Sequence, residues 1–186
     1  MMQWLARPVG ASNRGIAPSD IFRRIEPIVS SLRVLLVPQS HAKLYTHLVF
    51  STKHREPYLI DTVREDLHRY MAGTLKELKC HPVLINSVED HVHLLFDLAR
   101  TAAICDVVEQ IKVGSSKWMK MQERSLEAFA WQNGYGAFSV SQSNVEAVRG
   151  YIANQQEHHR RKSFQDEYRT MLRLHEIEWD ERYVWD

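Results

Sequence analysis

The chain has 186 residues, 44% of them hydrophobic and 25% charged, which suits one globular domain with some additional length. The formal net charge of +1 excludes a uniformly basic protein, so any affinity for nucleic acid must come from local basic patches. Two cysteines, Cys80 and Cys105, are too few for a disulfide framework, and no apolar run approaches the roughly 20 residues that span a bilayer; we therefore expect a cytoplasmic protein.

Residues 1–42 differ in composition from the rest of the chain. Four of the six prolines lie there, with weak hydrophobic periodicity between them, which predicts an N-terminal extension with little fixed structure. A short helix over residues 21–32 is the main element expected within it. Val37 and the residues after it resemble an ordinary protein N-terminus if the codon of Val37 is GTG and is read as the initiator methionine. We therefore expect the residues before Val37 to be disordered or absent from the native product.

Regular patterning begins with a predicted strand. Residues 44–50 are rich in β-branched and aromatic side chains. Thr62 and Glu65 have the spacing of a capping box, and apolar residues then recur at helical intervals. Two further strands are predicted at 83–88 and 91–98, paired as a hairpin.

The second half of the chain repeats the alternation of helix and strand. An amphipathic helix is predicted over 104–119, and residues 129–140 are aromatic and strand-like despite two glycines. Ser143 and Glu146 form a second capping-box pattern, which opens a helix predicted to run to His159. The charged remainder is expected to be a helix or a tail packed on the body.

This order of elements predicts an α+β fold. Helices would cover one face of a mainly antiparallel sheet in a ferredoxin-like or RRM-like arrangement, with one more helix at the C-terminal end. We expect this domain to cover residues 43–170 and a tail to cover 171–186.

A histidine pair at 91 and 93 is the strongest chemical feature of the sequence. Alternate side chains of a strand share a face, so His91 and His93 would project together while Val92 and Leu94 face the core. Two imidazoles placed in this way can bind one divalent ion. A pair of surface histidines on a half-exposed strand is the competing interpretation. A zinc site that recruits Cys80 and His81 is a third, but it lacks a recognisable spacing.

The predicted helix near the C-terminus carries Tyr151 and Gln155. Four residues apart, they would lie one above the other at the edge of the apolar stripe. A phenol attacks a phosphate only when its proton is removed and the developing charge is neutralised, and an amide oxygen can ligate a metal. A tyrosine in this position is also typical of an amphipathic core residue.

Four segments in the same order resemble the single-tyrosine HUH transposases, the small insertion-sequence transposases and their relatives associated with repetitive extragenic palindromes. The resemblance covers roughly residues 43–169. The segments are LYTHLVFSTK at 44–53, DHVHLL at 90–95, WQNGYGAFSVS at 131–141 and VRGYIANQ at 148–155.

The resemblance implies an enzyme that cuts and rejoins single-stranded DNA. His91, His93 and Gln155 would bind Mg²⁺ or Mn²⁺, and Tyr151 on the catalytic helix would attack the scissile phosphate to leave a 5′-phosphotyrosine link and a free 3′-hydroxyl. The sequence identifies no separate general base for Tyr151.

The resemblance also implies partners. The substrate would be single-stranded DNA with hairpins at the element ends. Insertion-sequence members work as dimers in which Tyr151 and Gln155 would complete the partner's site, whereas the palindrome-associated relatives can act as monomers. Several basic residues are candidates for DNA contacts. The competing interpretation of each is an ordinary solvent-exposed side chain. They are Lys53, Arg55, Lys112, Lys117, Arg160, Arg161 and Lys162.

Two other functions fit the same pattern. One is a domesticated endonuclease that keeps the fold without transposition. The other is a non-catalytic single-stranded nucleic-acid-binding module that uses sheet-face aromatics such as Tyr45 or Phe138, in which Tyr151→Phe would be harmless.

Overall fold

A four-stranded antiparallel sheet forms the centre of the described structure. The computed structural model describes residues 40–159 and 163–185, so the predicted helix at 21–32 and the question of a start at Val37 lie outside it. The strands are β1 (Tyr45–Ser51), β2 (His81–Ser87), β3 (His91–Asp97) and β4 (Gly136–Val140), in the spatial order β2-β3-β1-β4. β1 pairs with both β3 and β4, which places β1 and β3 at the centre.

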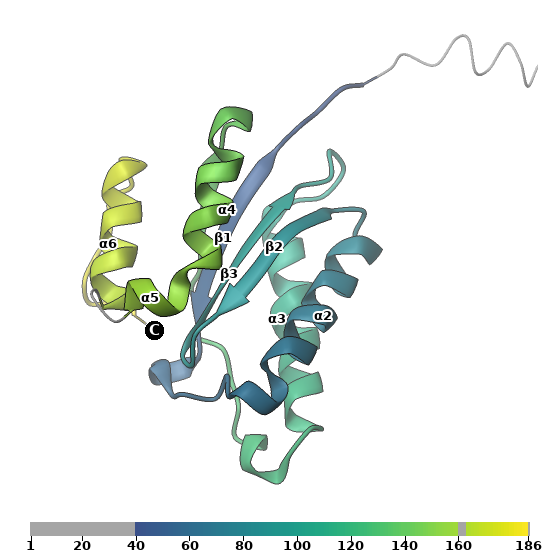
Figure 1. The fold of residues 1–186 in the computed structure, drawn as a ribbon, viewed down its shortest axis with the longest axis vertical. Helices are drawn as coiled ribbons and strands as arrows, with labels where there is room; N and C mark the ends of the chain where they lie inside the picture. Colours follow the sequence, from purple (N-terminus) through teal and green to yellow (C-terminus); the bar gives the residue numbers. More distant parts are fainter. Residues whose placement is uncertain (1–39, 160–162, 186) are drawn as a thin grey trace, which may run out of the picture. The chain divides into compact units, whose positions relative to one another are not determined.

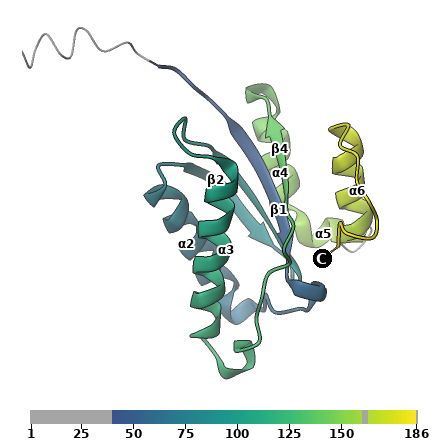
Figure 2. The ribbon, with the colours of Figure 1, turned by 180° about the vertical axis from the view of Figure 1, so that it is seen from behind.

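The connections confirm the predicted ferredoxin-like α+β fold. α2 (Asp61–Glu77) links β1 to β2, and α3 (Ile104–Lys120) links β3 to β4. Both helices lie on one side of the sheet, and α4 (Val145–Ala153) lies on the other (Figures 1 and 2). α5 (Gln155–His159) and α6 (Phe164–Leu174) follow α4 on that second side (Figure 1). Three short 3-10 turns complete the description, at Lys53–Arg55, Arg124–Leu126 and Gln142–Asn144.

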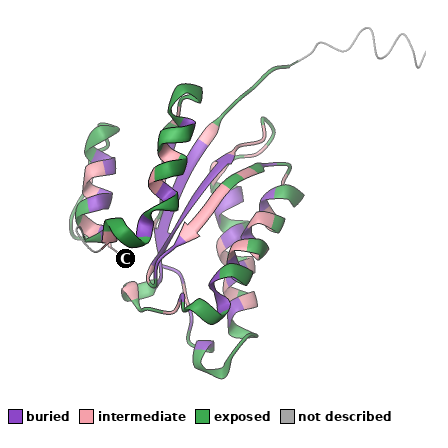
Figure 3. Cartoon of the chain, viewed as in Figure 1, coloured by how far each residue is buried: buried purple, intermediate pink, exposed green. Residues whose placement is uncertain are grey.

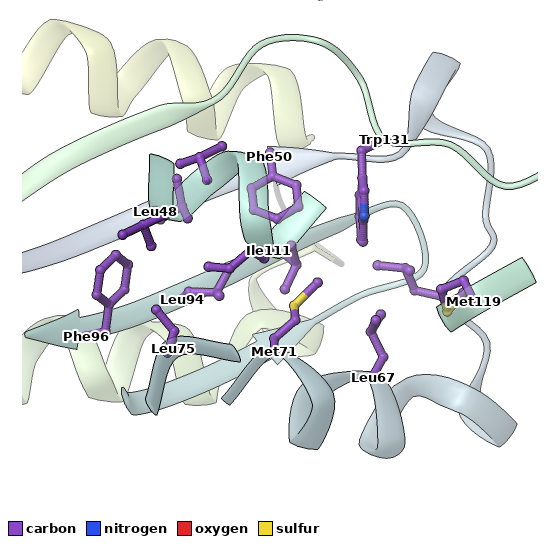
Figure 4. Close-up of a cluster of buried hydrophobic side chains, with 14 of the residues drawn as sticks. Leu48, Phe50, Leu67, Met71, Leu75, Leu94, Phe96, Ile111, Met119 and Trp131 are labelled. Carbon is purple, nitrogen blue, oxygen red and sulfur yellow. The ribbon is translucent and has the colours of Figure 1, made fainter. Parts of the chain in front are cut away.

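The face of the sheet beneath α2 and α3 carries the main hydrophobic core. The side chains of β1 and β3 that point to this face, Leu48, Phe50, Leu94 and Phe96 among them, are completely buried (Figure 4). Phe50 packs edge-on against Trp131, with 4.8 Å between ring centroids. Figure 3 shows that burial runs along β1 and β3, whereas the edge strand β2 is partly exposed.

The opposite face is covered by smaller clusters under α4 and α6. Leu95 packs with Val145 and Ile152 of α4, while Phe138 of β4 packs with α6. Gly136 permits the close approach of α6, because a Cβ at this position would lie 2.8 Å from the Tyr168 ring. This face is therefore not an open platform, and Phe138 is only 2% exposed.

Both predicted capping boxes are wrong. α2 begins at Asp61, one residue before Thr62, and the Thr62 hydroxyl donates to Glu123 and caps no backbone amide of the helix. Ser143 lies in the 3-10 turn before α4, where its hydroxyl bonds with that of Ser141. Each pattern lies near the start of a helix, but Thr62 bonds to a residue distant in sequence and Ser143 to a residue of its own turn.

Three other boundaries differ from prediction. Only Gly136–Val140 of the strand predicted at 129–140 pairs continuously with β1, and Trp131 forms an isolated bridge with Thr52. The predicted helix at 144–159 breaks at Asn154 into α4 and α5. The expected domain end at residue 170 falls inside α6, where Met171 and Leu172 are buried.

Among the described residues, no helix combines the length and the apolar character needed to cross a membrane.

Candidate metal and nucleophile site

His91 and His93 lie on the α4 side of β3, and both are completely buried. Their neighbours Val92 and Leu94 point into the main core on the other side, as strand alternation predicts. The competing interpretation of an exposed surface pair is therefore excluded. Burial lowers the pKa of both imidazoles, that of His93 strongly, and thereby favours the neutral form that binds a metal.

The Nδ1 atoms of the two imidazoles are engaged by hydrogen bonds. His91 Nδ1 lies 2.6 Å from Asp90 Oδ1, and His93 Nδ1 lies 2.9 Å from His47 Nε2 on the neighbouring strand β1. A partner at one ring nitrogen fixes the orientation of the ring and leaves the other nitrogen for a ligand. The Nε2 atoms of His91 and His93 are thus the two nitrogens left to bind.

Asp90 is itself held by Arg55. The Arg55 guanidinium donates to Asp90 Oδ2 at 2.9 Å, from a turn in which His54 and Arg55 both adopt positive φ angles near 60°. Burial opposes ionisation of Asp90, but the hydrogen bond from His91 and the Arg55 guanidinium lower the pKa of this carboxyl. The predicted contact of Arg55 with DNA stays a prediction; in this structure its side chain supports the histidine site.

Tyr151 lies on α4 next to the same histidines. Its half-buried ring has its centroid 6.1 Å from that of His93 and 6.2 Å from that of His47, edge-on to both. The ring of His158 of α5 also packs against it, with 5.1 Å between the centroids. The structure thus brings the predicted nucleophile and the predicted metal ligands together within one chain.

Gln155 reaches the site because the helix breaks before it. Asn154 leaves the helical conformation, so α5 starts in a new direction and Gln155 becomes completely buried. Gln155 Nε2 donates to Glu167 Oε1 at 3.0 Å. Burial lowers the pKa of His91, and Asp90 and the Gln155 side chain act in the opposite direction.

Three buried side-chain atoms of the described residues lack a hydrogen-bond partner: His91 Nε2, His93 Nε2 and Gln155 Oε1. Buried polar atoms are nearly always partnered, so three together are unusual. All three are lone-pair donors of the types that ligate divalent metals. The predicted ligands therefore fit a divalent cation by an observation independent of the motif.

Glu167 of α6 is a member of the site that sequence analysis missed. Its carboxylate lies 3.8 Å from His93 Nε2, and the ligand atoms of His91, His93 and Glu167 all lie within 4.8 Å of one another. Oε2 of Glu167 forms a hydrogen bond with His159 Nε2 at 3.0 Å. Burial raises the pKa of Glu167 to about 8 in the absence of a cation, with Asp90 adding to the effect.

A cavity of about 390 Å³ opens beside Tyr151. Its lining comes from β1 and from α4, α5 and α6, and consists mainly of rings and aliphatic side chains: His47, Val148, Tyr151, His158, Glu167, Thr170, Met171, Leu174 and His175. A cavity next to a nucleophile offers room for part of a substrate.

Three of the other basic residues predicted to contact DNA, Lys53, Lys112 and Lys117, lie around the loop at 132–134. Lys53 and Lys117 are exposed and line two shallow hollows that share Gln132 and Asn133. Lys112 differs, because its ammonium already donates to the backbone carbonyls of Gln132, Asn133 and Gly134. The basic run at 160–162 (Arg160, Arg161 and Lys162) lies outside the described residues.

The zinc alternative finds no support in the part of the chain that the structure describes. Cys80 is buried in the main core, on the side of the sheet opposite His91 and His93, and its sulfur accepts from the Ala99 amide. The single cluster of potential ligands in residues 40–159 and 163–185 is that of His91, His93 and Glu167.

Sequence signals existed for two of the missed residues. His47 belongs to the predicted first strand, on the face opposite Leu48 and Phe50, but its pairing with His93 depends on the register of β1 against β3. Glu167 interrupts the apolar stripe of α6 formed by Phe164, Tyr168 and Met171, and a carboxylate at a core position indicates a buried partner.

Comparisons with known proteins identify the family of this chain. The model of the family described as "Transposase IS200 like" matches residues 40–155. The ISDra2 transposase TnpA of Deinococcus radiodurans is 25% identical over 118 residues, which cover 61% of this chain and 84% of the relative.

Two solved structures share the fold. The crystal structure of a protein from Deinococcus radiodurans R1, described as a transposase, is 25% identical with a TM-score of 0.51, and the match covers 64% of this chain and 95% of that one. The REP-associated tyrosine transposase, solved with a REP hairpin, is 13% identical with a TM-score of 0.51, over 66% of this chain and 73% of that one. Because the family model covers more than half of the sequence, the chain belongs to the IS200-like transposases, a family of enzymes that recombine DNA.

Proposed function

We propose that this protein is a metal-dependent transposase that cuts and rejoins single-stranded DNA through a covalent link to Tyr151. The observation that carries the proposal is the set of three unpartnered buried atoms, His91 Nε2, His93 Nε2 and Gln155 Oε1, next to the Tyr151 ring. A buried site with unsatisfied lone pairs and a neighbouring phenol is suited to phosphoryl transfer.

The donor set favours a hard or borderline divalent cation such as Mg²⁺ or Mn²⁺. Two imidazoles and an amide oxygen offer no thiolate, which weighs against a structural zinc site. When bound, the cation supplies Lewis-acid polarisation of the scissile phosphate. Asp90 and His47 hold the two imidazoles in the orientation that ligation through Nε2 requires.

Tyr151 supplies the nucleophile. Its Oη forms a bond to phosphorus while the bond from phosphorus to the 3′ oxygen breaks, which leaves a 5′-phosphotyrosine and a 3′-hydroxyl. The phenol loses one proton and the departing 3′ oxygen gains one, so the step needs no net proton, oxidant or nucleotide cofactor. A 3′-hydroxyl of another strand reverses the step, and the covalent link conserves the energy for rejoining.

We propose single-stranded DNA with hairpin ends as the substrate. The related fold solved with a REP hairpin supports this choice, as do the exposed Lys53 and Lys117 around the loop at 132–134. The cavity beside Tyr151 gives the strand access to the nucleophile.

The arrangement within one chain supports a site that is complete in cis. Tyr151 and Gln155 lie against the histidines of their own sheet, as a monomer would need. A homodimer in which the subunits exchange α4 is the alternative assembly. The chain would then change direction at the segment between β4 and α4 or at the break at Asn154.

The test is a denaturing gel of the protein with labelled single-stranded DNA that carries candidate element ends. Wild type, Tyr151→Phe and the control Tyr58→Phe, which alters a ring packed on the opposite face of the sheet, are compared with Mg²⁺, Mn²⁺ or EDTA. We expect label at protein size for wild type and Tyr58→Phe, and none for Tyr151→Phe or with EDTA. Intact DNA binding without any adduct would instead favour the non-catalytic binding module.

A further inference from the structure

We propose that Glu167 of α6 is a positioning residue for the cation site, because it holds the Gln155 carboxamide by its nitrogen and leaves the oxygen free to ligate a cation. The inference rests on the metal-dependent function proposed above and deepens it. It also extends the site to α6, which lies beyond the residues 40–155 that match the family. The C-terminal part of this chain would thus be part of the active site and not merely a tail.

The hydrogen bond between the two side chains determines which end of the carboxamide faces the histidines. Gln155 Nε2 donates to Glu167 Oε1 at 3.0 Å, which leaves Gln155 Oε1 as the buried atom without a partner. An amide oxygen can ligate a cation, whereas the amide nitrogen cannot. Without an acceptor at Glu167, the carboxamide could turn over and present its NH₂ group to the imidazoles.

Glu167 also secures the short helix that carries Gln155. α5 has only five residues, and a helix of that length is not stable by itself. Glu167 Oε1 accepts from Gln155, the first residue of α5, and Oε2 forms a hydrogen bond with His159, the last residue, both at 3.0 Å. One side chain on α6 therefore fixes both ends of α5 after the break at Asn154.

Direct ligation by Glu167 is the competing arrangement. Oε1 lies 3.8 Å from His93 Nε2 and already accepts from Gln155, and Oε2 is already bonded to His159. If Glu167 only positions Gln155, an oxygen that accepts from Gln155 Nε2 is sufficient. If Glu167 ligates the cation directly, the negative charge of its carboxylate is needed as well. Glu167→Gln separates the two, because glutamine keeps one acceptor oxygen and loses the charge.

The experiment measures the dissociation constant of Mn²⁺ for the full chain by calorimetry and by the spectrum of the bound ion. The variants are Glu167→Met, which removes the acceptor with little change in volume, Glu167→Gln, Gln155→Ala and the double variant Glu167→Met/Gln155→Ala. Glu178→Ala is the control, since it removes an exposed carboxylate from the same C-terminal segment. Thermal unfolding without metal verifies that each variant folds, and Glu167→Ala replaces Glu167→Met if the latter does not.

We expect Glu167→Met to weaken Mn²⁺ binding about tenfold and Glu167→Gln to remain within about threefold of wild type. The double variant should bind as Gln155→Ala does, because Glu167 acts through Gln155. Wild-type affinity in Glu167→Met overturns the inference alone, and an equal loss in Glu167→Gln replaces positioning with direct ligation. No Mn²⁺ binding by wild type, or binding that survives His93→Ala, overturns the proposed metal site and the inference with it.

Discussion

The two faces of the sheet serve different purposes although the same strands build them. Along β3, Val92, Leu94 and Phe96 point into the close-packed core beneath α2 and α3. The alternate residues His91 and His93 point toward α4, where polar groups are buried and some atoms lack partners. Burying unpartnered polar atoms costs stability, and the apolar face offsets that cost.

This comparison teaches that strand alternation can separate stability from chemistry within one segment. The supports of the histidines, Asp90 and His47, come from the same central strands or the turn before them. The groups expected to react or ligate beside them, Tyr151 and Gln155, come from helices on the second face. Substitutions on the two faces should therefore have separable effects.

The largest expected effect on stability is that of Phe96→Ala. Phe96 is completely buried in the main core, and removal of such a ring leaves a cavity. We expect the free energy of unfolding to fall by about 3–5 kcal/mol, measured by urea denaturation. The folded fraction should still bind Mn²⁺ with wild-type affinity. A loss below about 1 kcal/mol would mean that this face is not the main source of stability.

Addition of metal should stabilise the protein through the other face. At a free Mn²⁺ concentration of about one hundred times the dissociation constant, a single site adds about 2.7 kcal/mol to the free energy of unfolding. We expect this gain in wild type and its loss in His93→Ala or after addition of EDTA, as measured by the thermal midpoint. Phe96→Ala is the matched control and should retain the full gain. An equal gain in His93→Ala would place the cation elsewhere.

Two lysines of α3 should separate packing from DNA contact. Lys112 donates to three loop carbonyls, and burial lowers its pKa to about 8, whereas Lys117 is exposed. We expect Lys112→Met to reduce the free energy of unfolding by about 1–2 kcal/mol, which allows for its partial exposure. Lys117→Met should leave stability unchanged. It should lower the slope of log K for DNA binding against log salt concentration by about 1, the change expected for one lost phosphate contact. The reverse outcome would assign the DNA contact to Lys112.

The sheet and the common face of His91 and His93 could be predicted from the sequence, because both follow from the alternation of side chains between the two faces of a strand. The hairpin of β2 and β3 and the common face of His91 and His93 depend only on a period of two residues. The helix break at Asn154 was not predicted, because the residues around it have ordinary helical character and the tertiary bonds of Gln155 decide the break.

Glu167 could not be placed from the sequence for a different reason. Its contacts with Gln155 and His159 cross the segment at 160–162, and no periodic pattern specifies how α6 docks on α5. The capping boxes failed because Thr62 and Ser143 find other partners in the folded chain. Local patterns thus identified the helices, the strands and their buried faces, whereas contacts between distant segments determined how α6 docks and where Glu167 lies.

The smallest effect predicted is a pH dependence from the stabilising side of the sheet. His68 of α2 bonds with the Ser87 hydroxyl at 2.9 Å, and burial lowers its pKa to about 4, with Arg64 adding to the effect. The unfolded chain protonates this residue near pH 6.5, so between about pH 6.5 and 4 the unfolded state binds more protons and stability falls as the pH falls.

His68→Gln keeps a hydrogen-bonding group but does not titrate. Between pH 7 and 5 the full pKa difference corresponds to about 2 kcal/mol, and because His68 is partly exposed we expect the variant to lose about 1 kcal/mol less stability than wild type in urea denaturation. Equal losses would mean that the pH dependence arises from the histidines of the opposite face, chiefly His47, whose pKa burial also lowers to about 4.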